Sequence, residues 1–196
     1  MNAELLSAWL VGYLFGSIPF GLILTQLAGK GDVRDVGSGN IGATNVLRAG
    51  GKGLAAATLV LDCLKATAAI LIAGRLWPGT ESFAAAGALI GHLYPVWLRF
   101  RGGKGVATLL GILIALLPIA AAVYAIVWLG LLLTVRISSV AGIAAAVSAP
   151  IAAALLGAQN LFPMLLGFAL LVVWTHRANI HRLKTGTEPR IGKARA

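Results

Sequence analysis

The 196-residue sequence contains little charge and almost no cysteine. Charged residues make up 11% of the chain, six residues are acidic, and Cys63 is the single cysteine. One cysteine excludes an intrachain disulfide. The low charge and the 59% share of hydrophobic residues exclude an ordinary soluble domain, in which roughly 25% of residues are charged. The composition therefore indicates a membrane protein.

Several catalytic and ligand-binding signatures are also missing. No Gly-x-Ser-x-Gly motif surrounds Ser38, and no group of histidines, cysteines and acids has metal-site spacing. The His-x4-Asp signature of glycerolipid acyltransferases of the acyl-CoA type is absent at all three histidines. Residues 37–42 spell Gly-x-Gly-x-x-Gly but follow a charged segment instead of a buried strand, which excludes a dinucleotide site. We expect neither a metal nor a cofactor.

Apolar runs suited to crossing a bilayer occupy most of the chain, whose mean hydropathy is +0.90. They cover residues 5–27, 53–74, 82–98, 105–135, 140–156 and 161–175. The run 105–135 is too long for one ordinary span, and Pro118 near its middle predicts two short helices. We therefore expect an all-α polytopic membrane protein with seven transmembrane helices, forming a single domain over residues 1–196.

Small residues predict how the first and third spans are built. Residues 12–16 and 87–91 both spell Gly-x-x-x-Gly, which favours close helix contacts. Residues 17–19, Ser-Ile-Pro, predict a kink or break in the first span. The segment before this span has no lysine or arginine and no evident cleavage site, so we do not expect a cleaved signal peptide.

Lysines and arginines are concentrated between the spans. Four lie in residues 28–52, three in 99–104, one at Arg136 and six in the tail 176–196. With seven spans all four segments share one face, which the positive-inside rule makes cytoplasmic. We expect the N-terminus outside and the C-terminus inside. Topology then explains the net charge of +10 without a nucleic-acid partner, and the tail bases are expected mainly to anchor to lipid headgroups.

The polar stretch 37–48 reads Gly-Ser-Gly-Asn-Ile-Gly-Ala-Thr-Asn-Val-Leu-Arg. Its glycines allow a tight turn, and its backbone N–H groups and hydroxyls can bind an anion. Arg48 adds a permanent charge with forked donors suited to phosphate. Residues 102–105 place Lys104 among glycines at a predicted helix start, another favourable position for an anion. We predict an anion site, with simple helix connection as the alternative.

Five further polar residues lie in or at the ends of spans. Asp62 and Lys65 share a helix face, where either charge alone would cost about 2.5–3.5 kcal/mol. We expect this pair to support the fold or orient the loops, with direct catalysis as the alternative. For His92 a structural hydrogen bond and proton transfer are both open. His176 and Asn179, three residues apart at the end of the last span, are predicted hydroxyl or phosphate ligands, with helix-end capping as the alternative.

Three motifs carry a resemblance to a known family. They are residues 37–48, residues 91–108 with Gly-His-Leu-Tyr-Pro and Phe-Arg-Gly-Gly-Lys-Gly-Val-Ala-Thr, and residues 176–188 with His-Arg-Ala-Asn-Ile and Gly-Thr-Glu. Over essentially its whole length the chain resembles the bacterial acyl-phosphate:glycerol-3-phosphate acyltransferases. The resemblance implies a multi-pass protein of the bacterial inner membrane with its active site on the cytoplasmic face. It also implies acyl transfer from acyl phosphate to the 1-hydroxyl of sn-glycerol 3-phosphate, giving lysophosphatidic acid and phosphate in the first step of phospholipid synthesis.

The resemblance and the residue chemistry together suggest site residues. Catalytic roles are expected for Ser38, Arg48, Lys104, Ser139 (preferred over Ser138), His176 and Asn179. Substrate contacts are expected from Gly37, Gly39, Asn40, Gly42, Thr44, Asn45, Gly102, Gly103 and Glu188. An acyl phosphate is a mixed anhydride with a good leaving group, so positioning and charge neutralisation are expected to suffice without a covalent acyl-enzyme.

A transporter of phosphorylated solutes is the alternative function, with the same loops as its anion site. The polar residues gather at one face instead of the midplane, and no inverted repeat is evident, which both count against transport. A lipid-phosphate phosphatase is disfavoured because no nucleophile or paired-histidine site is visible. The oligomeric state is left open.

Overall fold

The structure is a computed structural model that describes residues 3–191, and within this range it contains helices and no strand. The chain divides into two compact units, an N-terminal unit of residues 1–116 and a C-terminal unit of residues 117–196. The all-α prediction is confirmed for the described residues. Two compact units are not by themselves two folding domains, so the single-domain prediction stays a prediction.

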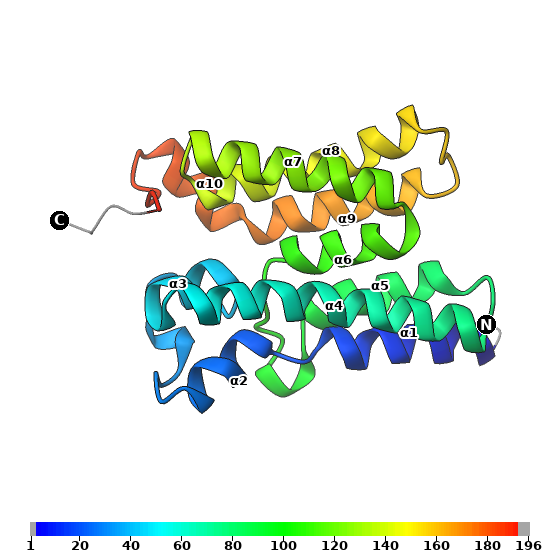
Figure 1. The fold of residues 1–196 in the computed structure, drawn as a ribbon, viewed down its shortest axis with the longest axis horizontal. Coiled ribbons are helices and arrows are strands. Elements are labelled where there is room, and N and C mark those ends of the chain that lie inside the picture. Colours follow the sequence, from blue (N-terminus) through cyan, green and yellow to red (C-terminus); the bar gives the residue numbers. More distant parts are fainter. Residues whose placement is uncertain (1–2, 192–196) are drawn as a thin grey trace. The chain divides into compact units, whose positions relative to one another are not determined.

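From residue 3 onward, the N-terminal unit contains six α-helices and two short 3-10 helices. In chain order these are α1 (Ala3–Gly16), α2 (Phe20–Leu27), η1 (Val33–Asp35), α3 (Ala43–Gly50), α4 (Lys52–Leu76), α5 (Glu81–Leu93), η2 (Val96–Leu98) and α6 (Val106–Leu116). Helices α1, α4 and α5 lie alongside one another (Figure 1). The predicted break in the first span is confirmed, because the chain leaves helical geometry between α1 and α2, where Pro19 has no backbone N–H to donate.

Helices α1 and α5 approach closely through their glycines. A β-carbon on Gly12 would lie 2.1 Å from the carbonyl oxygen of Ala84 in α5. A β-carbon on Gly91 would lie 2.3 Å from the carbonyl oxygen of Tyr13 in α1. Any side chain at these positions would force the helices apart. The close contacts predicted from the two Gly-x-x-x-Gly motifs are confirmed.

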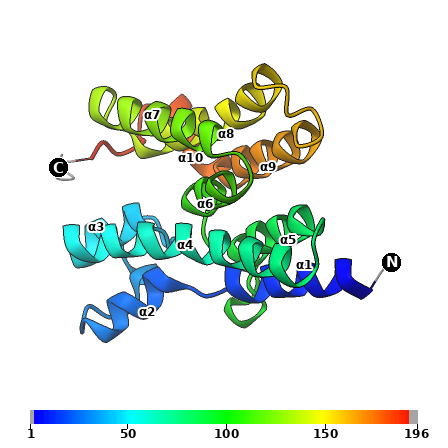
Figure 2. The same ribbon diagram turned by 45° about the vertical axis from the view of Figure 1, so that its right-hand side comes forward.

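The described part of the C-terminal unit, up to residue 191, contains four helices. They are α7 (Pro118–Thr134), α8 (Ser138–Leu155), α9 (Phe162–Thr175) and α10 (Arg177–Lys184). Helix α8 packs against both α7 and α9 (Figures 1 and 2). Helix α10 is bent by 57° from α9. Because His176 lies at this bend and Asn179 lies on α10, the expectation that both residues end one continuous helix is wrong.

The lengths of the helices test the predicted spans. Within residues 3–191, three stretches are long and apolar enough to cross a membrane, Ala3–Leu27, Lys52–Leu76 and Ser138–Leu155. The bent pair Phe162–Thr175 with Arg177–Lys184 makes a fourth if counted as one span. The predicted division of residues 105–135 at Pro118 is confirmed by α6 and α7. The predicted span 82–98 is helical only to Leu93, shortly before Pro95. Seven spans and the orientation of the termini stay predictions.

Candidate active site

The polar stretch 37–48 is half turn and half helix. Gly37 and Gly39 have φ angles of +61° and +69°, a left-handed conformation that glycine adopts without steric cost. Helix α3 then begins at Ala43, so the second half of the stretch is helical. Val46 on this helix is buried while Arg48 is exposed, and this amphipathic placement stabilises the helix against the unit's core.

The side chain of Asn45 holds this turn together. It is 1% exposed, and its Nδ2 donates to the carbonyl oxygens of Val33, Val36 and Asn40 at 2.7, 2.9 and 2.8 Å. Its Oδ1 accepts a hydrogen bond from the backbone N–H of Ser38 at 3.0 Å. These bonds use the amide within the turn, so Asn45 is placed to shape the loop from beneath.

Part of the backbone in the turn is also used internally. The N–H of Gly39 donates to the carbonyl of Val36 at 3.1 Å, and that of Gly42 donates to Oδ1 of Asn40 at 2.9 Å. The Nδ2 of Asn40 donates to the carbonyl of Gly102 at 3.3 Å, which links the two glycine-rich segments. The N–H groups of Gly39 and Gly42 are therefore engaged inside the loop.

The groups of this stretch best placed for an external ligand are side chains. Ser38 and Arg48 are exposed, and Thr44 is half-buried in the first turn of α3. A β-carbon on Gly37 would lie 3.1 Å from Cδ of Arg48, so the arginine stem passes close to the turn. The two hydroxyls and the guanidinium are suitable donors to a phosphate.

The segment before Lys104 is fastened to the end of α5. The N–H of Gly102 donates to the carbonyl of Leu93 at 3.1 Å, and the N–H of Gly103 donates to the carbonyl of His92 at 3.0 Å. A β-carbon on Gly103 would lie 2.0 Å from Nε2 of His92. Only glycine fits against the imidazole, and this contact fixes the chain just before Lys104 and the start of α6.

Beneath that segment lies a buried charged group. Asp62, Lys65 and His92 are 3%, 4% and 4% exposed. The ammonium of Lys65 contacts Oδ1 of Asp62 at 2.6 Å, the carbonyl oxygen of Ile18 at 2.8 Å and Nδ1 of His92 at 3.0 Å. An ammonium has three N–H donors, and here each finds an acceptor. Since Nδ1 of His92 accepts, the neutral ring carries its proton on Nε2, the atom that faces Gly103.

In the C-terminal unit the predicted residues gather around the carboxylate of Glu188. Its Oε1 accepts hydrogen bonds from the hydroxyl of Ser139 at 2.7 Å and from Nδ2 of Asn179 at 2.6 Å. Its Oε2 accepts from Nε of Arg182 at 2.7 Å. Burial raises the pKa of Glu188, but the hydrogen bonds from Asn179, Ser139 and Arg182 outweigh burial and hold this pKa below its ordinary value.

Both carboxylate oxygens of Glu188 accept hydrogen bonds from protein donors, among them Ser139 and Asn179. The expected contact of Glu188 with substrate stays a prediction. Arg182 was missed by the sequence interpretation, although it lies three residues after Asn179 on the same helix face and is a natural partner for the only acid of the tail. The backbone N–H of Ile191 donates to the carbonyl of Arg136 at 2.8 Å, which ties this segment of the tail to the start of α8.

His176 is 3% exposed, and its Nδ1 lies 2.8 Å from the carbonyl oxygen of Val172. A carbonyl oxygen only accepts, so Nδ1 carries the proton and a neutral ring has its acceptor at Nε2. The histidine therefore donates from Nδ1 to a carbonyl near the end of α9. Among residues 3–191 no group of three or more histidines, cysteines and acids is arranged to hold a metal ion.

Comparisons with known proteins converge. The family described as glycerol-3-phosphate acyltransferase matches residues 6–186. The glycerol-3-phosphate acyltransferase of Mesorhizobium japonicum is 56% identical over 192 residues, covering 98% of this chain and 98% of that protein. That of Erythrobacter litoralis is 55% identical over 185 residues, covering 94% of each.

Two solved structures are similar along nearly the whole chain. A crystal structure of PlsY (YgiH), an integral membrane glycerol 3-phosphate acyltransferase, in its glycerol 3-phosphate form matches with a TM-score of 0.90 at 41% identity, covering 96% of both chains. The lysophosphatidic acid form of PlsY matches with a TM-score of 0.88 at 40% identity, covering 96% of this chain and 95% of the other.

Proposed function

The chain belongs to the glycerol-3-phosphate acyltransferase family and is an integral membrane acyltransferase, and on this premise we propose that it uses acyl phosphate as its donor. The acceptor is the 1-hydroxyl of sn-glycerol 3-phosphate. The products are lysophosphatidic acid and inorganic phosphate, in the first step of phospholipid synthesis. Membership of an acyltransferase family removes the ground for the transporter alternative.

The proposed reaction requires the protein mainly to position the two substrates and to neutralise their negative charge. The glycerol 1-oxygen forms a bond to the acyl carbonyl carbon, and the bond from that carbon to the phosphate oxygen breaks. Phosphate leaves with the electron pair, and the hydroxyl proton passes to the phosphate or to a base. Because phosphate is a good leaving group, rate comes from positioning the substrates and neutralising their charge.

The observation that supports this proposal most directly is the buried cluster around Glu188. The hydroxyl of Ser139 and the amide of Asn179 are 2% and 5% exposed and held by the same carboxylate oxygen. Pre-oriented polar groups in an apolar protein suit a small polar substrate. We assign glycerol 3-phosphate to Ser139, His176 and Asn179.

We assign the acyl phosphate to the loop of the N-terminal unit. The hydroxyls of Ser38 and Thr44 would donate to its phosphate, and Arg48 and Lys104 would neutralise the two substrate phosphates. Asp62, Lys65 and His92 act indirectly, because their network supports the two glycines that precede Lys104. Asn45 shapes the loop in the same indirect way. We place the protein in the bacterial inner membrane, with these loops on the cytoplasmic face.

The proton has two possible acceptors, Nε2 of His176 and the substrate phosphate. We favour the phosphate, because it develops negative charge as it leaves. General-base catalysis is typically worth about 10²–10⁴ in rate. A loss of only a few-fold in the turnover of His176→Ala would therefore discard the histidine as base, and a loss within that range would support it.

The donor is tested with detergent-purified protein and labelled glycerol 3-phosphate. Long-chain acyl phosphate, acyl-CoA and acyl carrier protein thioester are offered in parallel. We expect labelled lysophosphatidic acid from the acyl phosphate alone. Equal product from a thioester would overturn the donor assignment, and no product from any donor with folded protein would overturn the proposed activity.

Lys104→Ala tests the charge assignment, with Lys184→Ala as the matched control because Lys184 is an exposed lysine at the end of α10. Loss of one preorganised donor to developing charge typically costs about 10²–10³ in turnover. We expect that loss for Lys104→Ala and none for Lys184→Ala. Equal turnover in both variants would contradict the assignment of Lys104.

A further inference from the structure

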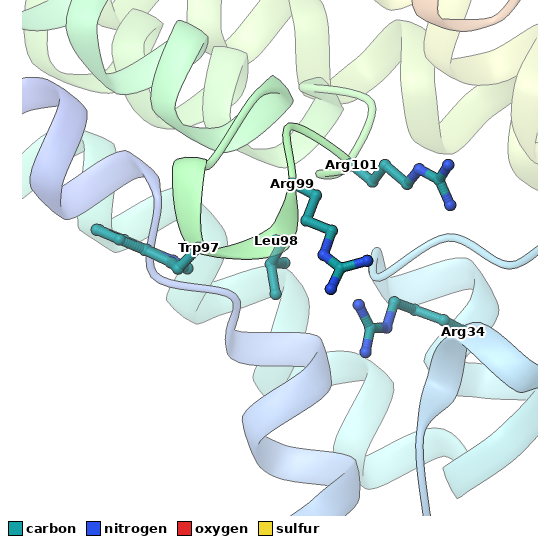
Figure 3. A pocket seen from close by; sticks show the side chains of 5 residues that line it. All are labelled: Arg34, Trp97, Leu98, Arg99 and Arg101. Carbon is teal, nitrogen blue, oxygen red and sulfur yellow. The ribbon is translucent and has the colours of Figure 1, made fainter.

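A hollow of about 400 Å³ opens on the N-terminal unit, and none of the residues that line it is assigned to the reaction. Its lining is Arg34, Trp97, Leu98, Arg99 and Arg101. Figure 3 shows the guanidinium groups of Arg34 and Arg99 facing each other, with that of Arg101 beside them. Two segments far apart in the sequence thus bring three permanent positive charges to one place.

The backbone that presents two of these arginines adopts an unusual conformation. Arg99 and Phe100 have φ angles of 53° and 60°, in the left-handed region that is sterically unfavourable for a residue with a side chain. The turn is closed by the N–H of Arg99 donating to the carbonyl of Val96 and by that of Phe100 donating to Pro95, both at 3.0 Å. Strain of this kind is found at ligand clamps and is maintained by surrounding structure.

Helix α1 supplies that surrounding structure. The hydroxyl of Tyr13 donates to the carbonyl of Tyr94 at 2.9 Å and accepts from the N–H of Val96 at 3.0 Å. The indole N–H of Trp97 donates to the carbonyl of Ser17 at 2.9 Å. The turn is therefore anchored on both sides, and its arginines are displayed from a fixed backbone.

The charges of the hollow are only partly balanced. Arg34 is bound by Asp32, whose two carboxylate oxygens both lie 3.0 Å from Nε, and this bond lowers the pKa of Asp32 so that it stays ionised. Asp35 is a second acid whose charge acts on Arg34. Arg99 and Arg101 are exposed, and within residues 3–191 their guanidinium groups form no hydrogen bond or ion pair. An anion would relieve the repulsion among the three arginines.

The surroundings of the hollow identify the kind of anion. Val96, Trp97 and Phe100 are 52%, 50% and 60% exposed beside the arginines. Exposed aromatic and basic side chains just beyond the end of an apolar helix are typical of the headgroup level of a membrane. Arginine forks match phosphate oxygens in pairs. We propose that this hollow binds the phosphate group of an anionic lipid headgroup, independently of the acyl-transfer reaction.

The test compares wild-type protein with the double variant Arg99→Gly/Arg101→Gln in neutral detergent. Glycine is chosen at position 99 because it retains the left-handed backbone. Native mass spectrometry measures the binding of short-chain phosphatidic acid, phosphatidylglycerol and phosphatidylcholine, with inorganic phosphate as a separate arm. We expect the wild type to prefer the two anionic lipids, and the variant to bind them about tenfold more weakly, since each lost bond is to a charged group.

The matched control is Arg75→Gln/Lys52→Gln, which removes the same amount of charge from exposed positions outside the hollow and outside the basic tail. It should keep wild-type lipid affinity, and acyl transfer without added lipid should show that both double variants are folded. Unchanged affinity in the hollow variant, or equal loss in the control, overturns the proposal. Binding of inorganic phosphate that depends on the hollow arginines, without lipid binding, would assign the hollow to free phosphate and overturn the lipid assignment.

Discussion

The two units organise their polar residues in different ways. In the N-terminal unit a neutral amide, that of Asn45, bonds the backbone of a single local turn. In the C-terminal unit an ionised carboxylate, that of Glu188, bonds side chains from the start of α8 and from α10. The first arrangement depends on the path of the chain, and the second depends on a charge.

This difference has a physical reason. A buried amide costs little once its donors and acceptors are paired, whereas a buried carboxylate needs strong, charge-assisted donors. An amide can therefore shape a loop without adding charge next to a phosphate. A carboxylate fixes side chains more firmly but makes them sensitive to pH. Substitutions that change the charge of a side chain but keep its shape should therefore affect stability differently in the two units.

The largest loss of stability is expected at the buried ion pair of the N-terminal unit, where Asp62 and Lys65 carry charge. Lys65→Met leaves the carboxylate of Asp62 buried without its cation, and breaking a buried pair costs about 3–5 kcal/mol. Thermal unfolding in detergent measures the loss, and Asp62→Asn/Lys65→Met should recover much of it. Equal stability of the single and double variants would show that the pair does not carry the charge balance of this region.

Asn45→Asp tests the amide itself, because it keeps the shape and removes both N–H donors. Each backbone acceptor left unpaired costs about 1–3 kcal/mol, so we expect a destabilisation of about 3 kcal/mol. Misplacement of catalytic groups by about 1 Å can cost 10²-fold, and acyl transfer should fall by about that factor. The control is Asn160→Asp at an exposed turn, which should be neutral. Normal turnover in Asn45→Asp would refute the shaping role.

Glu188→Gln tests the carboxylate. Because the folded pKa of Glu188 lies below the ordinary value of 4.5, its contribution to stability is fully present above that value and is lost as pH falls through the folded pKa. We expect the variant to be less stable than wild type by about 1 kcal/mol near neutral pH. The two unfolding curves should converge in acid. A difference that stays constant down to about pH 3 would contradict a role for ionisation.

The smallest effect concerns Thr108 in the first turn of α6. Its hydroxyl is fully buried and is the one such side-chain oxygen or nitrogen in residues 3–191 without a hydrogen-bond partner. Thr108→Val removes that unpaired group at similar volume and should stabilise the protein by up to about 1 kcal/mol. Thr25→Val is the control. The equally buried hydroxyl of Thr25 donates to the carbonyls of Gly21 and Leu22, so its removal should destabilise the protein.

Much of the fold follows from the sequence because a bilayer forces long apolar runs to be helical. The run predicted at residues 53–74 matches α4 (Lys52–Leu76), and Pro118 separates α6 from α7 as expected. Helix α3 could not be predicted from a long apolar run. It has eight residues and lies in a glycine-rich stretch, and its formation depends on the burial of Asn45 and Val46.

The sequence indicates the candidate residues as a set, but it does not show which contacts each of them makes. Glycine and hydroxyl residues near Arg48 and Lys104 favour an anion site, which stays a prediction, and the sequence does not say which donors are bonded within the loop itself. The bend at His176 and the attachment of Arg182 to Glu188 both depend on contacts to particular atoms. Such contacts produce no periodic pattern in the sequence and cannot be predicted from it.

The break between α1 and α2 has a consequence for biogenesis. The carbonyl of Ile18, where the chain leaves helical geometry, accepts a hydrogen bond from the buried ammonium of Lys65. During insertion the first span thus carries a polar defect and α4 carries a costly charge, and each satisfies the other. We therefore expect the first span and α4 to enter the bilayer together. The break caused by Pro19 frees the carbonyl of Ile18, and this carbonyl helps α4 to carry Lys65 into the membrane.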